Sequence, residues 1–455
     1  MSHRSSRWLR GMAVLALVGV LSILASVTGP SRDAMGALPA FLVWLACLVL
    51  VVRELRPAGL LSFPATYLLL LGVFHLGLMV PLALGARPRF DEEWLHSGSM
   101  SKSLILVALA SASFALGVVG GGQGRDASPP PGRRHVVRPL VIGGLLWAAI
   151  GAVLFWKGGE SLGVLRLSYD DYWTTIEVSD PRAFSTGLMF LVSGVLVAAA
   201  GASSRGMILL GIGLALVLAP IFAKGFRGIP LTAGITFMVV WYRKAPRVAT
   251  RVALVGCAFA LVAVPAIRMS REAAITQVAA PVDQVSPFEF FTEAGGSLRP
   301  LVETIQAIDS GKHGLWMGRS YALAAARVVP NVSLRWEAAA EEEASLTPDQ
   351  WVSARADDWK IGFSGVAEPY LNFGVAGVVL YFAALGFILV RADAVAGRSP
   401  YWCAVVASTQ AALLWTVRND VMALIRTAAW SAAVVLVIRA AVHLRPMLPS
   451  FPRTD

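Results

Sequence analysis

The chain has 455 residues, of which 56% are hydrophobic and only 15% are charged, and it carries a formal net charge of +11 and a mean hydropathy of +0.66. Soluble globular domains carry about 25% charged residues, so this composition excludes an ordinary soluble protein. In a membrane protein, the positive charge indicates basic cytoplasmic loops beside anionic lipid, and no nucleic-acid partner is predicted.

The apolar residues fall into about twelve separate runs of a length that suits helices crossing a bilayer, and they do not alternate as barrel strands do. The eighth run, at 229–242, is short enough to be a re-entrant or broken helix instead. The first run, Met12 to Val27, follows a basic segment, and we interpret it as an uncleaved helix and not as a signal peptide. The others lie at residues 35–52, 60–84, 103–121, 139–156, 185–202, 206–223, 229–242, 249–267, 370–390, 399–416 and 421–441. The sequence therefore predicts an all-α polytopic integral membrane protein with about 12 transmembrane helices.

Every second loop is basic, for example at Arg53 and Arg56, and again from Arg243 to Arg251. Because basic loops stay in the cytoplasm, this alternation places both termini inside. The remaining loops are predicted to lie outside, and they include the longest one, from Arg268 to about Ser364.

The longest loop is too long for a simple connection. Within it, Ser297–Asp309 carries an apolar stripe and begins with Ser297 as a candidate cap, which predicts a helix, and a second helical segment precedes Pro330. We therefore divide the chain into N-terminal transmembrane helices at 1–267, a large, partly helical extracytoplasmic loop at 268–364, and C-terminal transmembrane helices at 365–455. This loop fits either a lid over a substrate site or a simple extracytoplasmic cap.

One carboxylate, Glu368, lies where the stretch Gly362–Val390 passes from polar residues into an apolar span. An ionisable residue at that depth is energetically costly and indicates a functional site. The alternative is a Glu at the interface that caps the helix following it, because a negative charge is favourable near a helix N-terminus. Position alone leaves both interpretations open.

Several basic residues fall on the predicted outer side, against the general trend of the loops. They lie at or near the ends of apolar runs: Lys224, Arg227, Arg268, Arg271 and Arg418. Arg426 follows Arg418 by eight residues, about 12 Å deeper at the helical rise. Any one of them could snorkel to the interface or form a structural ion pair. If they converge, they form a cationic pocket, because guanidinium groups grip phosphate oxygens, and the predicted ligand is a lipid-linked phosphate or pyrophosphate.

Several common catalytic and metal-binding motifs are absent, among them the phosphate-cradling GxxxxGK[ST], HExxH and CxxC. The three cysteines lie far apart within apolar runs, and acidic doublets such as Asp170-Asp171 favour solvated charge over a metal site. We therefore predict neither a metal ion nor a cofactor.

Three stretches together resemble a known family. They are GFRG at Gly225–Gly228, RSYALAAARVVPN in the long loop, and GFSGVAEPYLNFGVAGVVLYFAALGFIL from Gly362. In combination they resemble bacterial O-antigen polymerases and related oligosaccharide repeat-unit polymerases of the Wzy type, over roughly the half of the chain from Ala223 to the last span. One departure is Asn331, which stands after the proline of VVPN where the family pattern has an Arg.

The resemblance implies a fold like the membrane-embedded C-type glycosyltransferases and a metal-independent reaction. In that reaction, the growing glycan moves from undecaprenyl diphosphate to the sugar end of a new lipid-linked repeat unit on the outer face of the bacterial cytoplasmic membrane. The implied partners are the undecaprenyl-diphosphate-linked oligosaccharide, membrane lipid, a flippase and a chain-length regulator.

Residue roles follow from combining the resemblance with the charges. Glu368 is the candidate base for the acceptor hydroxyl, although it could instead orient an arginine. Tyr370 and Asn372 would shape the site or bind sugar. The candidate diphosphate-binding residues are Arg227, Arg268, Arg271 and Arg418, with Arg426 as a deeper contact and Lys224 beside them.

Three other functions compete with this one. An O-antigen ligase would use the same pocket chemistry with another acceptor, and no residue separates the two decisively. A transporter or flippase for lipid-linked sugars would bind diphosphate through the same arginines, but the sequence shows no internal repeat of the kind typical of transporters. A purely structural membrane protein gives no account of the outer arginines.

Overall fold

The computed structural model describes residues 37–83, 93–122, 136–161, 182–223, 228–276, 288–311, 313–328, 347–356 and 362–444. Within these ranges every regular element is a helix, and no strand occurs. Seven of the described helices are long and apolar enough to cross a membrane: α5 (Ser99–Gly121), α6 (Arg138–Ser161), α8 (Arg182–Gly201), α9 (Ser204–Ala223), α11 (Pro246–Thr276), α16 (Ala367–Arg398) and α18 (Met422–Leu444). The predicted all-α polytopic membrane fold is confirmed.

Four more predicted runs correspond to shorter helices, which are α2 (Leu38–Glu54), α3 (Phe63–Leu76), α10 (Gly228–Tyr242) and α17 (Pro400–Trp415). The run at 60–84 is divided, because α3 ends at Leu76 and the short α4 (Met79–Ala83) follows. The first predicted span, Met12 to Val27, lies outside the described residues. The count of about twelve spans therefore stays a prediction.

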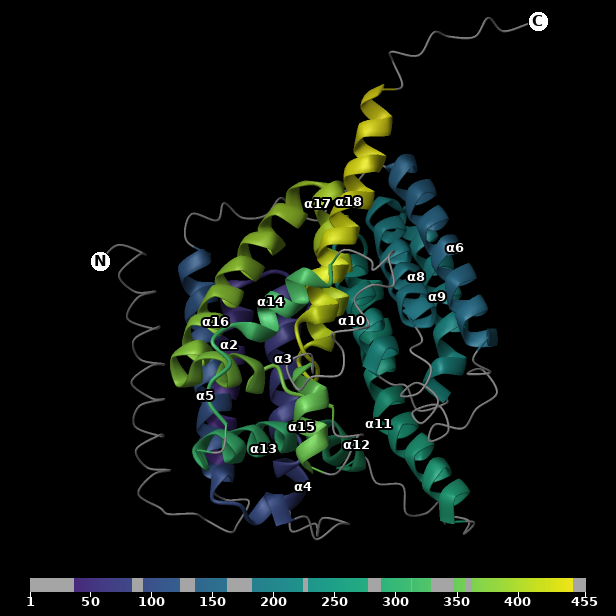
Figure 1. Cartoon of the computed structure of the whole chain (residues 1–455). Coiled ribbons are helices and arrows are strands. Elements are labelled where there is room, and N and C mark those ends of the chain that lie inside the picture. Colours follow the sequence, from purple (N-terminus) through teal and green to yellow (C-terminus); the bar gives the residue numbers. More distant parts are fainter. Residues whose placement is uncertain are drawn as a thin grey trace, which may run out of the picture. The chain divides into compact units, whose positions relative to one another are not determined.

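The chain forms two compact units, and each combines segments that are distant in sequence. The first unit draws on Met1–Asp126, Arg251–Asp393 and Leu413–Arg426, and the second draws on Ala127–Thr250, Ala394–Ala412 and Thr427–Asp455. Figure 1 shows these elements in chain colours. The candidate site lies within the first unit, because all of its residues whose side chains the structure describes belong to that unit.

Helices α5 and α16 of the first unit pack with their backbones in close contact. A Cβ atom added at Gly117 would lie 2.0 Å from the carbonyl oxygen of Ala383, and one at Gly386 would lie 2.2 Å from that of Phe114. Glycine is needed at both positions because any side chain would force the helices apart. Nearby, Phe63 at the start of α3 donates its backbone N–H to the buried Asp393 near the end of α16. These contacts fix α16, which carries Glu368 at its other end.

The long loop contributes four described helices, α12 (Phe288–Ala294), α13 (Leu298–Asp309), α14 (Arg319–Ala326) and α15 (Pro348–Ala356). Helices α12, α13 and α15 lie at the end of the unit where α4 is found, with α12 against α4 and α15 against α13 (Figure 1). Leu301 and Ile305 of the predicted stripe are buried. The prediction of a partly helical loop is confirmed for these residues.

The predicted cap at Ser297 is wrong in one respect. Ser297 does precede α13, but its side chain makes no capping hydrogen bond. A 3-10 turn, Gly295–Ser297, leads directly into α13, so Ser297 has helical dihedral angles (φ −69°, ψ −5°). A capping serine needs an extended backbone, which this turn does not provide. By contrast, α15 shows one of the two hydrogen bonds of a capping box, in which the backbone N–H of Thr347 donates to Gln350 Oε1 at 3.0 Å.

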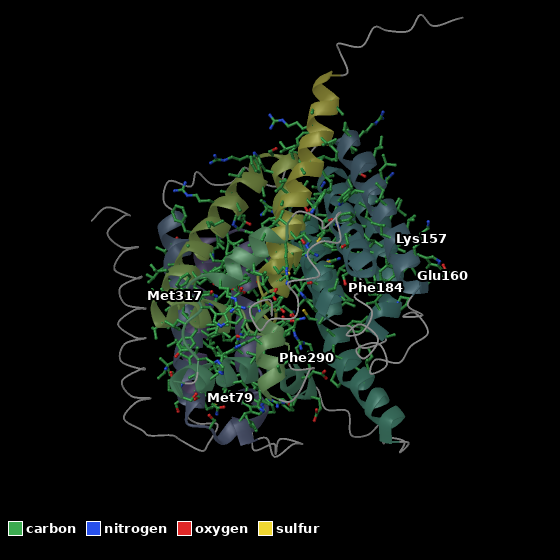
Figure 2. The ribbon with its side chains drawn as sticks, in the orientation of Figure 1. Met79, Lys157, Glu160, Phe184, Phe290 and Met317 are labelled. Atoms are coloured by element: carbon green, nitrogen blue, oxygen red, sulfur yellow. The ribbon has the colours of Figure 1, made fainter. Side chains whose placement is uncertain are left out.

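In the second unit, α6 and α8 form an antiparallel pair that also depends on glycine. A Cβ atom at Gly151 would lie 2.3 Å from the backbone nitrogen of Leu191, and one at Gly187 would lie 2.2 Å from that of Phe155. The rings of Phe155 and Phe184 are 4.5 Å apart between centroids. Figure 2 accordingly shows Phe184, near the start of α8, close to the end of α6.

Candidate functional site

The first turn of α16 carries Glu368, and the start of this helix is fixed by a serine. Ser364 Oγ accepts hydrogen bonds from the backbone N–H groups of Val366 and Ala367, at 3.2 Å and 3.3 Å. His75 of α3 holds that hydroxyl in place, since its Nε2 lies 2.7 Å from Ser364 Oγ and its Nδ1 lies 2.9 Å from the carbonyl oxygen of Leu71. A buried polar network therefore determines where α16 begins.

Helix α16 is broken about two turns after its start, at Gly374, whose backbone has φ 64° and ψ −151°. Only glycine occupies that region readily. The break releases two carbonyl groups from the helix, and the long loop supplies their partners: the N–H of Trp316 donates to Leu371 O and that of Met317 to Asn372 O, both at 2.9 Å. Met317 itself has φ 49° and is 74% exposed. The segment before α14 is thus docked on the break by its backbone.

The carboxylate of Glu368 lies between two other segments and is only 3% exposed. Its Oε1 accepts a hydrogen bond from Ser320 Oγ of α14 at 2.7 Å, and its Oε2 accepts one from the backbone N–H of Val421 at 2.8 Å. Val421 immediately precedes α18, so the negative charge lies at the N-terminus of that helix, where backbone dipoles stabilise it. Glu368 therefore contacts the N-terminus of a neighbouring helix as well as lying in the first turn of its own.

Asn372 connects the break in α16 to the same serine. Its amide nitrogen donates to Ser320 Oγ and to the carbonyl oxygen of Glu368, each at 2.8 Å. Its amide oxygen accepts from the backbone N–H groups of Gly318 and Ser320, at 3.1 Å and 3.4 Å. An amide side chain has two donor and two acceptor positions, so these four hydrogen bonds within the protein occupy all of them. The role predicted for Asn372, in shaping the site or binding sugar, stays a prediction.

Tyr370 links α16 to the loop helix α13. Its hydroxyl donates to Asp309 Oδ1 at 3.1 Å, and Lys102 Nζ of α5 lies 2.7 Å from both oxygens of that carboxylate. The Lys102 ammonium also lies 5.2 Å from the centroid of the Tyr370 ring, within range of a cation–π contact. The ring of Tyr370 is buried, and its hydroxyl faces the loop.

The structure adds a pair of carboxyl groups beside Glu368 that the sequence analysis missed. Asp420 lies in the turn before α18, where its Oδ1 accepts from the N–H of Met422 at 3.1 Å, and its side chain hydrogen-bonds to that of Asp349 on α15. Burial, followed by the charges of Asp349 and Glu368, raises the pKa of Asp420 well above its ordinary value. Two carboxyl groups can share a hydrogen bond only while one keeps its proton, so this pair joins the loop to α18 in a protonated form.

We expect this pair to make stability depend on pH. A carboxyl group whose pKa is raised on folding stabilises the folded protein at pH values below its ordinary pKa, here 3.8. That stabilisation is lost as the pH rises through the raised pKa. Thermal unfolding of the detergent-solubilised protein should therefore occur at a lower temperature as the pH rises over this interval. Asp420→Asn cannot ionise and should weaken the dependence. An equal pH dependence in both proteins would contradict the shared proton.

The predicted cationic residues are described to different extents. Arg418 lies in the turn after α17, three residues before Val421, with its guanidinium carbon 5.7 Å from the centroid of Phe74. Its carbonyl oxygen accepts from the N–H of Phe363 at 3.0 Å, which ties this turn to the segment before α16. Arg426 is half-buried on α18.

The other four candidates are described less completely. Arg268 and Arg271 lie on α11, but their side chains are outside the description, and Lys224 and Arg227 lie wholly outside the described residues. The structure therefore brings Glu368, Tyr370 and Asn372 together beside the turn of Arg418. The convergence of all six cations stays a prediction.

Sequence reasoning missed Ser320 and Asp420, which both lie beside Glu368. A signal was present for Ser320, because the RSYALAAARVVPN stretch that carries the family resemblance begins one residue before it. Asp420 had a weaker signal, since it directly precedes the apolar run at 421–441 and lies in the same short turn as Arg418.

Comparison with known proteins bears on the whole of this site. A family model described as O-antigen polysaccharide polymerase Wzy matches residues 139–445, which is more than half of the chain and includes Glu368, Ser320, Asp420 and the predicted cations. No curated protein and no solved structure matches the chain. The match confirms the resemblance seen in the three sequence stretches. The chain belongs to the Wzy family of O-antigen polysaccharide polymerases.

Proposed function

We propose that this polymerase transfers the growing glycan from undecaprenyl diphosphate to the sugar end of a new lipid-linked repeat unit, on the outer face of the bacterial cytoplasmic membrane and without a metal ion. Family membership supports the general reaction, which is glycosyl transfer between lipid-linked oligosaccharides in a multi-pass membrane enzyme. The specific proposal rests on the position of Glu368. This buried carboxylate lies close to the break in α16 and accepts hydrogen bonds from two other segments of the chain.

Glu368 acts as the base in this proposal. The acceptor hydroxyl attacks the anomeric carbon of the donor sugar, forming a new C–O bond, while the bond from that carbon to the diphosphate oxygen breaks and the electron pair leaves with undecaprenyl diphosphate. The hydroxyl proton passes to Glu368. Each carboxylate oxygen accepts one hydrogen bond from the described part of the chain, and an oxygen of this kind has a second acceptor position for a substrate hydroxyl.

The leaving diphosphate gains negative charge as the bond breaks, and we assign its stabilisation to cationic side chains. Arg418 is the best supported of them, because its turn is fixed against the start of α16 and leads into Val421. The same role is proposed for Arg227, Arg268, Arg271, Arg426 and Lys224. A guanidinium group can grip two phosphate oxygens at once, which is why the proposal needs no metal ion.

We also propose two protein partners, following the family resemblance. A flippase would supply the lipid-linked repeat unit from the cytoplasmic side, and a chain-length regulator would act on the polymer. Both fit a site on the outer face, where the predicted topology places the long loop and the turn of Arg418.

The test is polymerisation by the purified protein. Supplied with the host's undecaprenyl-diphosphate-linked repeat unit, the wild type should form a ladder of glycans with a metal chelator present. Arg418→Ala should slow ladder formation by about 10²- to 10³-fold. The matched control is Arg391→Ala, whose guanidinium carbon lies 5.4 Å from the centroid of Phe387 on the far half of α16.

Each part of the proposal can fail separately in this assay. A wild type that forms no ladder, while transferring glycan to a different acceptor, would point to a ligase. A ladder abolished by the chelator would contradict the metal-free reaction. Equal losses in the Arg418 and Arg391 variants would remove Arg418 from the diphosphate site.

A further inference from the structure

Three tyrosines from different segments lie near enough to Glu368 to interact with it electrostatically, and they take no part in the reaction proposed above. Tyr67 lies on α3, Tyr321 on α14, and Tyr381 on α16 beyond the break at Gly374. Glu368 interacts electrostatically with all three hydroxyl groups, and Tyr321 also interacts with the other two tyrosines. Side chains from three helices therefore form one cluster beside the candidate base.

Two of these hydroxyl groups lack a hydrogen-bond partner within the described part of the chain. The hydroxyl oxygens of Tyr67 and Tyr321 are buried, and neither makes a hydrogen bond to any residue that the structure describes. The whole side chain of Tyr67 has an exposed fraction of 0%. Burying a hydroxyl without a partner is unfavourable, so buried tyrosines nearly always find one. Two such exceptions beside one catalytic candidate indicate groups that bind a ligand.

The rings that carry these hydroxyls are held firmly by packing. The ring of Tyr321 lies nearly parallel to those of Phe373 and Tyr381, with centroid distances of 6.2 Å in both cases. Tyr67 stacks on Phe114 with centroids 5.3 Å apart. Fixed rings with unengaged hydroxyls have the character of a preorganised binding site, because little conformational entropy is lost when a ligand binds.

The charge at this position limits what the ligand can be. A phosphate would place its negative charge beside the carboxylate of Glu368, and like charges at short range repel. Burial, followed by electrostatic interaction with Tyr381, Glu368 and Tyr67, raises the pKa of Tyr321, so this hydroxyl keeps its proton and can both donate and accept. A sugar hydroxyl has the same double capacity and no charge.

We propose that Tyr67, Tyr321 and Tyr381 form a subsite that binds hydroxyl groups of the acceptor sugar and presents that sugar to Glu368. The proposal rests on the transfer reaction of the preceding section and adds the residues that would hold its acceptor. It also accounts for the docking of α14 on the broken helix, because that contact brings Tyr321 and Ser320 to the same carboxylate.

The test compares tyrosine-to-phenylalanine variants, which remove only the hydroxyl oxygen. Tyr67→Phe and Tyr321→Phe should each raise the KM for the host's lipid-linked repeat unit by about threefold to tenfold, the range expected for one hydrogen bond. The double variant should approach the product of the two effects. Tyr401→Phe is the matched control, because Tyr401 is a half-buried tyrosine on α17 in the second unit.

Thermal unfolding without substrate separates ligand binding from a structural role. Removing an unpaired buried hydroxyl should leave the unfolding temperature unchanged or raise it, since a desolvation cost disappears. Variants that unfold at lower temperature with an unchanged KM would overturn the proposal, because their hydroxyls would then hold the fold or a structural water. An unchanged KM with unchanged stability would overturn it as well. A wild type without any ladder would instead contradict the transfer reaction itself.

Discussion

Replacing Glu368 by Gln is expected to reduce the polymerisation rate by about 10²- to 10⁴-fold, the range that a positioned general base contributes. Glutamine has the same length and shape but cannot take up the acceptor proton. The measurement is the initial rate of ladder formation by purified protein with the host's lipid-linked repeat unit. Each oxygen of the Glu368 carboxylate accepts one hydrogen bond, whereas a glutamine side chain has only one acceptor oxygen. One of the two donors would therefore lose its partner, so some loss of stability is also expected.

Asp393→Asn provides the control for that loss of stability. Asp393 is a second buried carboxylate on α16, also 3% exposed, and it too accepts a backbone N–H, from Phe63 at 3.3 Å. Both variants should unfold at lower temperature, but only Glu368→Gln should lose catalysis while it remains folded. If Glu368→Gln retained its rate within a fewfold of wild type, Glu368 would serve to join α14, α16 and α18 and would not be the base.

The membrane helices could be predicted from the sequence because hydropathy is a local property. The run predicted at 421–441 corresponds to α18 (Met422–Leu444), and the run at 103–121 falls within α5 (Ser99–Gly121). Apolar composition over some twenty residues determines such a helix whatever it packs against. The stripe of α13 was predictable for a similar reason, since its spacing repeats with the helical period.

The surroundings of Glu368 depend on contacts that no local pattern encodes. Its two hydrogen-bond donors, Ser320 and Val421, come from 48 and 53 residues away in the sequence. The break in α16 was also hidden, because Gly374 lies in a stretch that is apolar enough for an uninterrupted span. Position alone left two interpretations of Glu368, a functional carboxylate and a helix cap, and the structure shows that it contacts the N-terminus of a different helix.

Replacing Gly374 by Ala is expected to cost about 1–3 kcal/mol of stability and to slow polymerisation by about 10²-fold, the loss that a misplacement of about 1 Å produces. A Cβ atom at this position would have room, as its nearest neighbour is Leu315 Cδ1 at 3.8 Å. The cost therefore comes from the backbone, because alanine avoids φ 64°, ψ −151° and favours a continuous helix. A continuous α16 would take back the carbonyl groups of Leu371 and Asn372 and release the loop that positions Ser320.

Gly234→Ala separates the effect of the break from that of glycine replacement in general. Gly234 lies within α10, and a Cβ atom there would meet nothing within 4 Å, so the change should be neutral or stabilise the helix by up to about 1 kcal/mol. The decisive measurements are the rate of ladder formation and the rate of proteolytic cleavage before α14. Release of the loop predicts a slower ladder and faster cleavage in Gly374→Ala alone. A Gly374→Ala protein with normal cleavage and a normal rate would show that α16 tolerates a continuous helix and that the break does not position the site.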